Sequence, residues 1–141
     1  MPGPAREQIT GLVLAGGRGT RMGGLDKGLI GFRGRALIAT VLERLRPQVG
    51  AILISANRNF DAYRAFGWPV VADTADGPQH LAGPLAGVLA GLRAARTPWL
   101  AVVPCDAPLL PADLVARLAA AAEPGGAAMA CVDGKDEPVF C

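Results

Sequence analysis

The chain alternates between short, almost wholly apolar runs and longer stretches in which apolar residues recur every three or four positions. Short apolar runs predict buried strands, and the longer spacing predicts amphipathic helices. The predicted strands are 9–15, 51–55, 70–72, 99–103, 127–132 and 137–140, with a brief extended stretch at 29–32. The predicted helices are 35–46, 61–66, 85–95 and 112–122, and most of them stop at a Pro or a Gly.

Strands that alternate with helices at this spacing indicate βαβ units. They predict an α/β fold, a three-layer α/β/α sandwich around a mainly parallel, Rossmann-like sheet. The 141 residues are enough for one core but not for two, so we expect a single domain over 1–141, with 1–7 as a flexible N-terminus.

Polar residues follow four of the predicted strands. They are the segment 16–27, Ser55 to Asn57, Asp73 and Asp106. Ligands of open α/β sheets bind at the carboxyl ends of the strands, where such residues gather. The pattern therefore predicts a ligand site at one edge of the sheet.

The segment 16–27 is dense in glycine and carries Arg18, Arg21 and Lys27. Glycine lets backbone N–H groups approach an anion closely, and three cations favour a polyphosphate. The segment does not match the P-loop motif, because no Gly-Lys-Ser/Thr occurs in the chain. It does not match the dinucleotide-binding motif G-x-G-x-x-G either, because Met22 occupies the position of the third glycine. The alternative is a tight turn with solvated arginines.

Composition narrows the classes of function. Half of the residues (51%) are hydrophobic, and the net charge of +2 has no basic run, so neither a disordered chain nor a nucleic-acid-binding stripe is indicated. No apolar stretch reaches the roughly 18 residues of a membrane span, and the first residues lack the apolar region of a secretory signal. We therefore expect a cytoplasmic protein without a membrane partner.

Cysteine and histidine usage excludes several kinds of site. Cys105, Cys131 and Cys141 are widely spaced, which fits neither a disulfide framework nor a zinc site, so we expect reduced packing residues. His80 is the single histidine, which leaves no basis for a histidine metal cluster or a histidine-dependent triad.

A few residues are candidates for chemistry in their own right. Asp106 is suited to Mg²⁺, which takes carboxylate oxygen and shares it with phosphates, although an Asp before Ala-Pro also starts turns. Asp73 is either a ligand residue or a helix N-cap. Lys27 suits charge neutralisation on a transferring phosphoryl group and Arg21 a bidentate clamp, with ordinary surface charge as the alternative for both. The segment 81–87 offers apolar contact and backbone amides for a flat base, or simply begins a helix.

The segment 12–28 resembles the signature loop of the nucleotidyltransferase superfamily, L-A-[GA]-G-x-[GS]-x-R-M-x-x-x-K. Its Leu-Ala-Gly-Gly and Arg-Met-Gly-Gly-x-Asp-Lys-Gly letters are most similar to the molybdenum cofactor guanylyltransferases. Further similarity lies at Ala56-Asn57-Arg58, at Asp73 before a stretch rich in Gly and Pro, at Gly83-Pro84-Leu85-Ala86-Gly87, at Pro104-Cys105-Asp106-Ala107-Pro108 and at Glu137-Pro138.

This resemblance implies a nucleotide-diphospho-sugar transferase type of fold and a Mg²⁺-dependent guanylyltransferase. Such an enzyme transfers GMP from GTP to molybdenum-molybdopterin and releases pyrophosphate, with molybdoenzyme maturation proteins as further partners. The nucleotide-binding residues implied are Leu14, Ala15, Gly16, Gly17, Lys27, Ser55, Asn57, Asp73, Gly83, Pro84 and Asp106. The catalytic residues implied are Arg21, Lys27 and Asp106, and Asp106 is the implied metal ligand.

The chain departs from the family pattern in two places. Ser55 stands where family members often have Asn, and the stretch between Asp73 and Gly83, which includes His80, is slightly longer. The family also continues past the position of Cys141 with an Asn-x-Asn-Thr-Pro-like segment, so the resemblance implies a C-terminally truncated chain.

Two alternatives remain open at this stage. One is a cytidylyl- or uridylyltransferase acting on molybdopterin or a sugar phosphate, although such relatives more often read Leu-Ala-Ala-Gly. The other is a non-catalytic, nucleotide-binding remnant.

Overall fold

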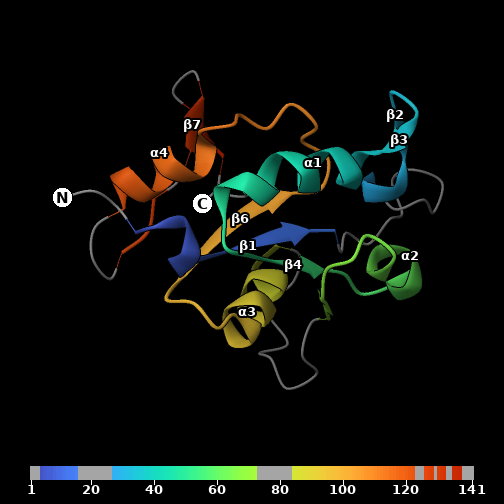
Figure 1. Cartoon of the computed structure of the whole chain (residues 1–141), viewed down its shortest axis with the longest axis horizontal. Helices are drawn as coiled ribbons and strands as arrows, with labels where there is room; N and C mark the ends of the chain where they lie inside the picture. The colour runs from blue at the N-terminus through green and yellow to red at the C-terminus, as the bar shows by residue number, and fades with distance from the viewer. Residues whose placement is uncertain are drawn as a thin grey trace.

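The computed structural model describes residues 4–15, 27–72, 84–122, 126–128, 130–132 and 135–137. Within them, four parallel strands form a sheet in the order β5-β4-β1-β6 (Figure 1). The strands are β1 (Ile9–Leu14), β4 (Ala51–Ser55), β5 (Val70–Val71) and β6 (Trp99–Pro104). If these four strands are numbered 1 to 4 along the chain, their order in the sheet is 3-2-1-4, which is Rossmann-like. The direction of winding reverses between β1 and β6.

Helices cover both faces of this sheet. They are α1 (Leu37–Leu45), α2 (Phe60–Arg64), α3 (Pro84–Ala94) and α4 (Leu114–Ala121), with short 3₁₀ turns η1 (Arg6–Gln8), η3 (Lys27–Leu29) and η4 (Arg46–Gln48). In Figure 1, α1 and α4 lie on one face and α3 on the other. The predicted three-layer α/β/α sandwich is confirmed. Among the described helices, none is long and apolar enough to cross a membrane.

Burial of β1 on both faces explains its unbroken apolar run. A Cβ on Gly11 would lie 2.8 Å from Leu45 Cδ2 on the α1 side, and a Cβ on Gly91 of α3 would lie 2.6 Å from Leu12 Cδ2 on the other. Leu12 and its neighbour Val13 are both fully buried. A parallel strand with helices on both faces has no solvated side, so its sequence shows no polar alternation.

A hairpin precedes α1, where the sequence predicts a helix from residue 35. Strand β2 (Gly31–Phe32) pairs antiparallel with β3 (Arg35–Ala36), so the helix begins two residues late. The two residues between them, Arg33 and Gly34, have φ of 51° and 80°. Positive φ at both central positions is typical of a type I′ turn, whose twist matches that of the two strands. This hairpin takes up residues 35 and 36, which the sequence pattern assigned to the helix.

The hairpin is tied to α1 by an exposed ion pair. Arg35 donates a hydrogen bond to the carboxylate of Glu43, and this guanidinium lowers the pKa of Glu43. The pair is on the surface, so it contributes little to stability.

The last described strands form a separate antiparallel pair, β7 (Ala130–Val132) with β8 (Lys135–Glu137). β7 lies within the predicted strand 127–132 and starts three residues later, and β8 begins at Lys135, two residues before the predicted strand 137–140. Val132 is paired with Lys135. Residues 133–134 and 138–140 lie outside the described residues.

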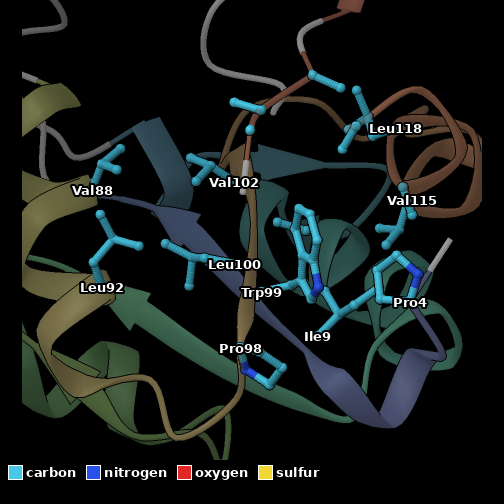
Figure 2. Close-up of a pocket in the computed structure, with 16 residues that line it drawn as sticks. Pro4, Ile9, Val88, Leu92, Pro98, Trp99, Leu100, Val102, Val115 and Leu118 are labelled. Carbon is cyan, nitrogen blue, oxygen red and sulfur yellow. The ribbon is translucent and has the colours of Figure 1, made fainter. Parts of the chain in front are cut away.

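An apolar groove of about 280 Å³ lies beside β6, which is an edge strand of the described sheet (Figure 2). Val88 and Leu92 of α3 line one side of it, and Val115 and Leu118 of α4 line the other. The groove includes none of the site residues predicted from the sequence.

Candidate nucleotide site

The carboxyl ends of β1, β4 and β6 meet at one edge of the sheet. The Ala15 N–H donates to the Ser55 carbonyl over 2.8 Å, and the Cys105 N–H donates to the Leu14 carbonyl over 3.1 Å. Both bonds extend the parallel register, in which Leu14 is opposite Ser55 on one side and Pro104 on the other. This edge therefore gathers Leu14, Ala15, Ser55 and the start of the Asp106 turn, at the place where the strand order reverses.

The first turn of α3 lies over this edge. A Cβ on Gly87 would lie 2.8 Å from Ser55 Oγ and 2.9 Å from Leu14 Cδ2, whereas Gly91, one turn later, faces Leu12 further down the strand. The helix thus runs antiparallel to β1, with its N-terminal end at the edge. Unpaired N–H groups and the helix dipole make such an end favourable for an anion. Gly87 and Gly91 allow this close packing of α3 on β1, because neither residue carries a Cβ.

Asp106 is exposed and lies on a turn, two residues after β6 ends at Pro104. The segment after it is held from α1 and η4, because Arg44 Nη1 donates to the Leu110 carbonyl over 3.0 Å. The Gln48 side-chain amide donates to the Pro111 carbonyl and accepts from the Val115 N–H, each over 2.9 Å. Gln48 thereby caps α4, whose own N-cap residue makes no side-chain cap hydrogen bond.

The residues at this edge fit Mg²⁺ that is bound by one carboxylate together with substrate phosphates and water. The described residues include no group of three or more His, Cys, Asp or Glu side chains that could hold a metal ion. Mg²⁺ is commonly bound by one or two carboxylates and completes its coordination with substrate phosphates and water. A single exposed carboxylate at a strand end, Asp106, matches that mode and does not match an all-protein metal cage.

The predicted site residues divide into three groups. Leu14, Ala15, Ser55, Asn57 and Asp106 are described: Ala15 and Ser55 are buried, Leu14 is half-buried, and Asn57 and Asp106 are exposed. Lys27 opens η3 and Pro84 opens α3, each placed by its backbone. Gly16, Gly17, Arg21, Asp73 and Gly83 lie outside the described residues, and their roles stay predictions.

Tyr63 is a further residue near this edge, and it was not among those predicted from the sequence. This residue of α2 is fully buried, and its hydroxyl donates a long hydrogen bond (3.5 Å) to the Ala15 carbonyl. A Cβ on Gly28 would lie 3.1 Å from the same hydroxyl oxygen and 3.3 Å from Cys105 Sγ. A five-residue helix has too little periodicity to reveal which residue faces inward, so no local signal pointed to Tyr63. Cys105 is buried and does not form a disulfide, as the sequence predicted.

Comparison with known proteins agrees with this geometry. Residues 11–141 match the MobA-like NTP transferase domain. The chain is 54% identical to the molybdenum cofactor guanylyltransferase of Cupriavidus necator, over 97% of this chain and 71% of that protein. It is 56% identical to the enzyme of the same name from Acidovorax ebreus, over 94% of this chain and 67% of that protein.

A solved structure shows the same fold. The molybdopterin-guanine dinucleotide biosynthesis protein A from Archaeoglobus fulgidus superposes with a TM-score of 0.65, at 22% identity. The superposition covers 93% of this chain and 65% of that one, so the chain spans about two thirds of the solved protein. On the match over residues 11–141 and the identity to curated relatives, the chain belongs to the MobA-like NTP transferase domain family.

Proposed function

We propose that this chain transfers GMP from GTP to the phosphate of molybdenum-molybdopterin, which forms the guanine dinucleotide form of the cofactor and releases pyrophosphate. The observation that carries the proposal is the 54% identity, over 97% of the chain, to an enzyme named molybdenum cofactor guanylyltransferase. The meeting of Leu14, Ala15, Ser55 and Asp106 at the switch point of the sheet supports it, because nucleotides bind there in such folds.

The reaction needs no protein nucleophile. An oxygen of the acceptor phosphate attacks the α-phosphorus of GTP, a new P–O bond forms, and the bond to the bridging oxygen breaks. Pyrophosphate leaves with that electron pair. The protein therefore contributes alignment and stabilisation of charge, which suits an edge at the N-terminal end of α3. Lys27 and Arg21 are the cations proposed to contact the phosphates.

Asp106 is the residue proposed to hold Mg²⁺. When bound, Mg²⁺ neutralises phosphate charge and favours departure of pyrophosphate. Arg44 and Gln48 hold the connection that carries Asp106 through hydrogen bonds to the Leu110 and Pro111 carbonyls, four and five residues after Asp106. Gly16, Gly17, Ser55, Asn57, Asp73, Gly83 and Pro84 are proposed to surround the nucleotide together with Leu14 and Ala15.

We also propose that the reaction takes place in the cytoplasm and without a nucleic-acid partner. Reduced thiols, of which the buried Cys105 is one, and a GTP substrate suit the cytoplasm. A net charge of +2 without a basic run gives no support for a nucleic-acid partner. Molybdoenzyme maturation proteins are the proposed recipients of the finished cofactor.

A transfer assay with a panel of nucleotides tests the proposal. The protein is incubated with Mg²⁺, molybdenum-molybdopterin and GTP, CTP or UTP, and both the dinucleotide product and pyrophosphate are measured. We expect acceptor-dependent product from GTP alone, and no pyrophosphate when the acceptor is left out. Preferential transfer from CTP or UTP would support the rival transferase. Binding of GTP without any product would support the non-catalytic alternative.

A further inference from the structure

Tyr63 brings together the backbone on both sides of the glycine-rich segment 16–27. Its hydroxyl donates to the carbonyl of Ala15, the residue before that segment, over 3.5 Å. The same oxygen closely approaches Gly28, the first residue after the segment, since a Cβ there would lie 3.1 Å away. One side chain from a different element, α2, therefore contacts both ends of the predicted phosphate-binding segment.

The end of β6 reaches the same point. Cys105 is buried, and its Cβ and Sγ would each lie 3.3 Å from a Cβ on Gly28. We call Tyr63, Cys105, Gly28 and the Ala15 carbonyl the Tyr63 cluster. Gly28 follows Lys27 and Cys105 precedes Asp106, so the cluster adjoins two proposed catalytic residues and includes a proposed nucleotide contact.

The surroundings of the Tyr63 hydroxyl indicate that it does more than fill space in the core. Tyr63 is fully buried within the main core, among Val13, Val103 and Ile38, so its ring is held on a rigid base. In Figure 1, α2 lies beyond the carboxyl ends of β1 and β4, outside the layer formed by α1. A phenylalanine would fill the same space, and the hydroxyl alone makes the polar contact with Ala15.

We propose that Tyr63 is a positioning residue for GMP transfer, acting by fixing Ala15 and Gly28 relative to Cys105. This inference rests on the proposed function, and it adds a residue outside the nucleotide site to that function. Loss of this positioning should lower the rate of GMP transfer, because a displacement of about 1 Å in a phosphate-contacting group can reduce a rate about 100-fold.

The variant Tyr63→Phe tests the inference, with Thr10→Val as its matched control. Thr10 is also buried, and its hydroxyl forms a 2.7 Å hydrogen bond with that of Thr97, at the opposite end of β1. Each substitution removes one hydroxyl and keeps the shape of the side chain. Thermal unfolding, the Kd for GTP, and kcat and KM for GMP transfer are measured for both, with activity expressed per folded protein.

We expect both variants to unfold at a lower temperature than the wild type. We also expect Tyr63→Phe to lower kcat about tenfold or more with a smaller change in KM, and Thr10→Val to leave both within about twofold. Equal kinetics in the two variants would overturn the inference and leave the proposed function intact. A wild-type protein that forms no dinucleotide would contradict the proposed function, and the inference with it.

A double variant tests whether the hydroxyl and Gly28 act together. Gly28→Ala places a methyl group against the Tyr63 hydroxyl, so we expect it to lower activity, and Tyr63→Phe should relieve part of that crowding. The loss in the double variant should therefore be smaller than the product of the two single losses. Losses that multiply would contradict the cluster. If Tyr63→Phe does not fold, Cys105→Ala alters the same contact from β6 and is compared with Thr10→Val in the same way.

Discussion

Asp106 is exposed at the end of a strand whose central residues are buried. Asp106 is not part of the core cluster, which includes the nearby Val103 and Cys105. The sequence allowed this residue to be located, since an Asp directly after an apolar run marks the carboxyl end of a strand. Tyr63 could not be located in the same way, because its importance depends on contacts with residues that are distant in the sequence.

We predict that Asp106→Asn lowers kcat for GMP transfer by about 100-fold or more, as expected for loss of a group that stabilises charge in the transition state. Stability should change by less than about 0.5 kcal/mol, because the side chain is exposed. The measurements are initial rates over a Mg²⁺ titration and thermal unfolding.

Asp113→Asn is the matched control for that substitution. Asp113 is an exposed carboxylate on the same connection to α4, and its side chain makes no cap hydrogen bond. It should keep the wild-type Mg²⁺ requirement and rate. Loss of activity in both variants to the same degree would rule out a specific role for the Asp106 carboxylate.

At the scale of elements, α3 reaches the site because its backbone lies close to β1 and to Ser55. Gly87 and Gly91 let the helix lie directly on β1 and on Ser55, which brings its N-terminal end to the strand ends. The sequence predicted each strand of the parallel sheet from its apolar run, and it predicted a helix over 85–95, which corresponds to α3. It did not predict the hairpin before α1, because an Arg-Gly turn with positive φ at Arg33 is an unusual choice for a type I′ turn.

We predict that Gly87→Ala weakens GTP binding and Gly91→Ala does not. Both substitutions crowd β1: overpacking costs roughly 1–3 kcal/mol, which the better helix propensity of Ala offsets by about 1 kcal/mol. Both variants should therefore be modestly destabilised. Only the methyl group at residue 87 meets Ser55 and Leu14, at the proposed nucleotide edge.

Calorimetric titration with GTP, alongside thermal unfolding, distinguishes the two positions. We expect the Kd for GTP to rise about tenfold in Gly87→Ala and to stay within about twofold of the wild type in Gly91→Ala. Equal affinities in both variants would mean that α3 does not shape the nucleotide site.

At the scale of the whole molecule, the strand order explains why residues far apart in the sequence form one site. β1 and β6 are neighbours although more than 80 residues separate them, and the winding reverses between them. The sequence could predict a parallel sheet and its ligand-binding edge, since both follow from βαβ alternation. It could not predict that Arg44 of α1 and Gln48 of η4 would hold the segment after Asp106, because those hydrogen bonds, to the Leu110 and Pro111 carbonyls, depend on tertiary packing.

The central claim is that this edge binds a guanine nucleotide, and calorimetric titration of the wild-type chain with GTP and with CTP, both in the presence of Mg²⁺, tests it most directly. We predict saturable binding of one GTP per chain, with CTP bound at least about tenfold more weakly, a difference of about 1.4 kcal/mol. Equal affinity for the two nucleotides, or no binding of either, would contradict the account.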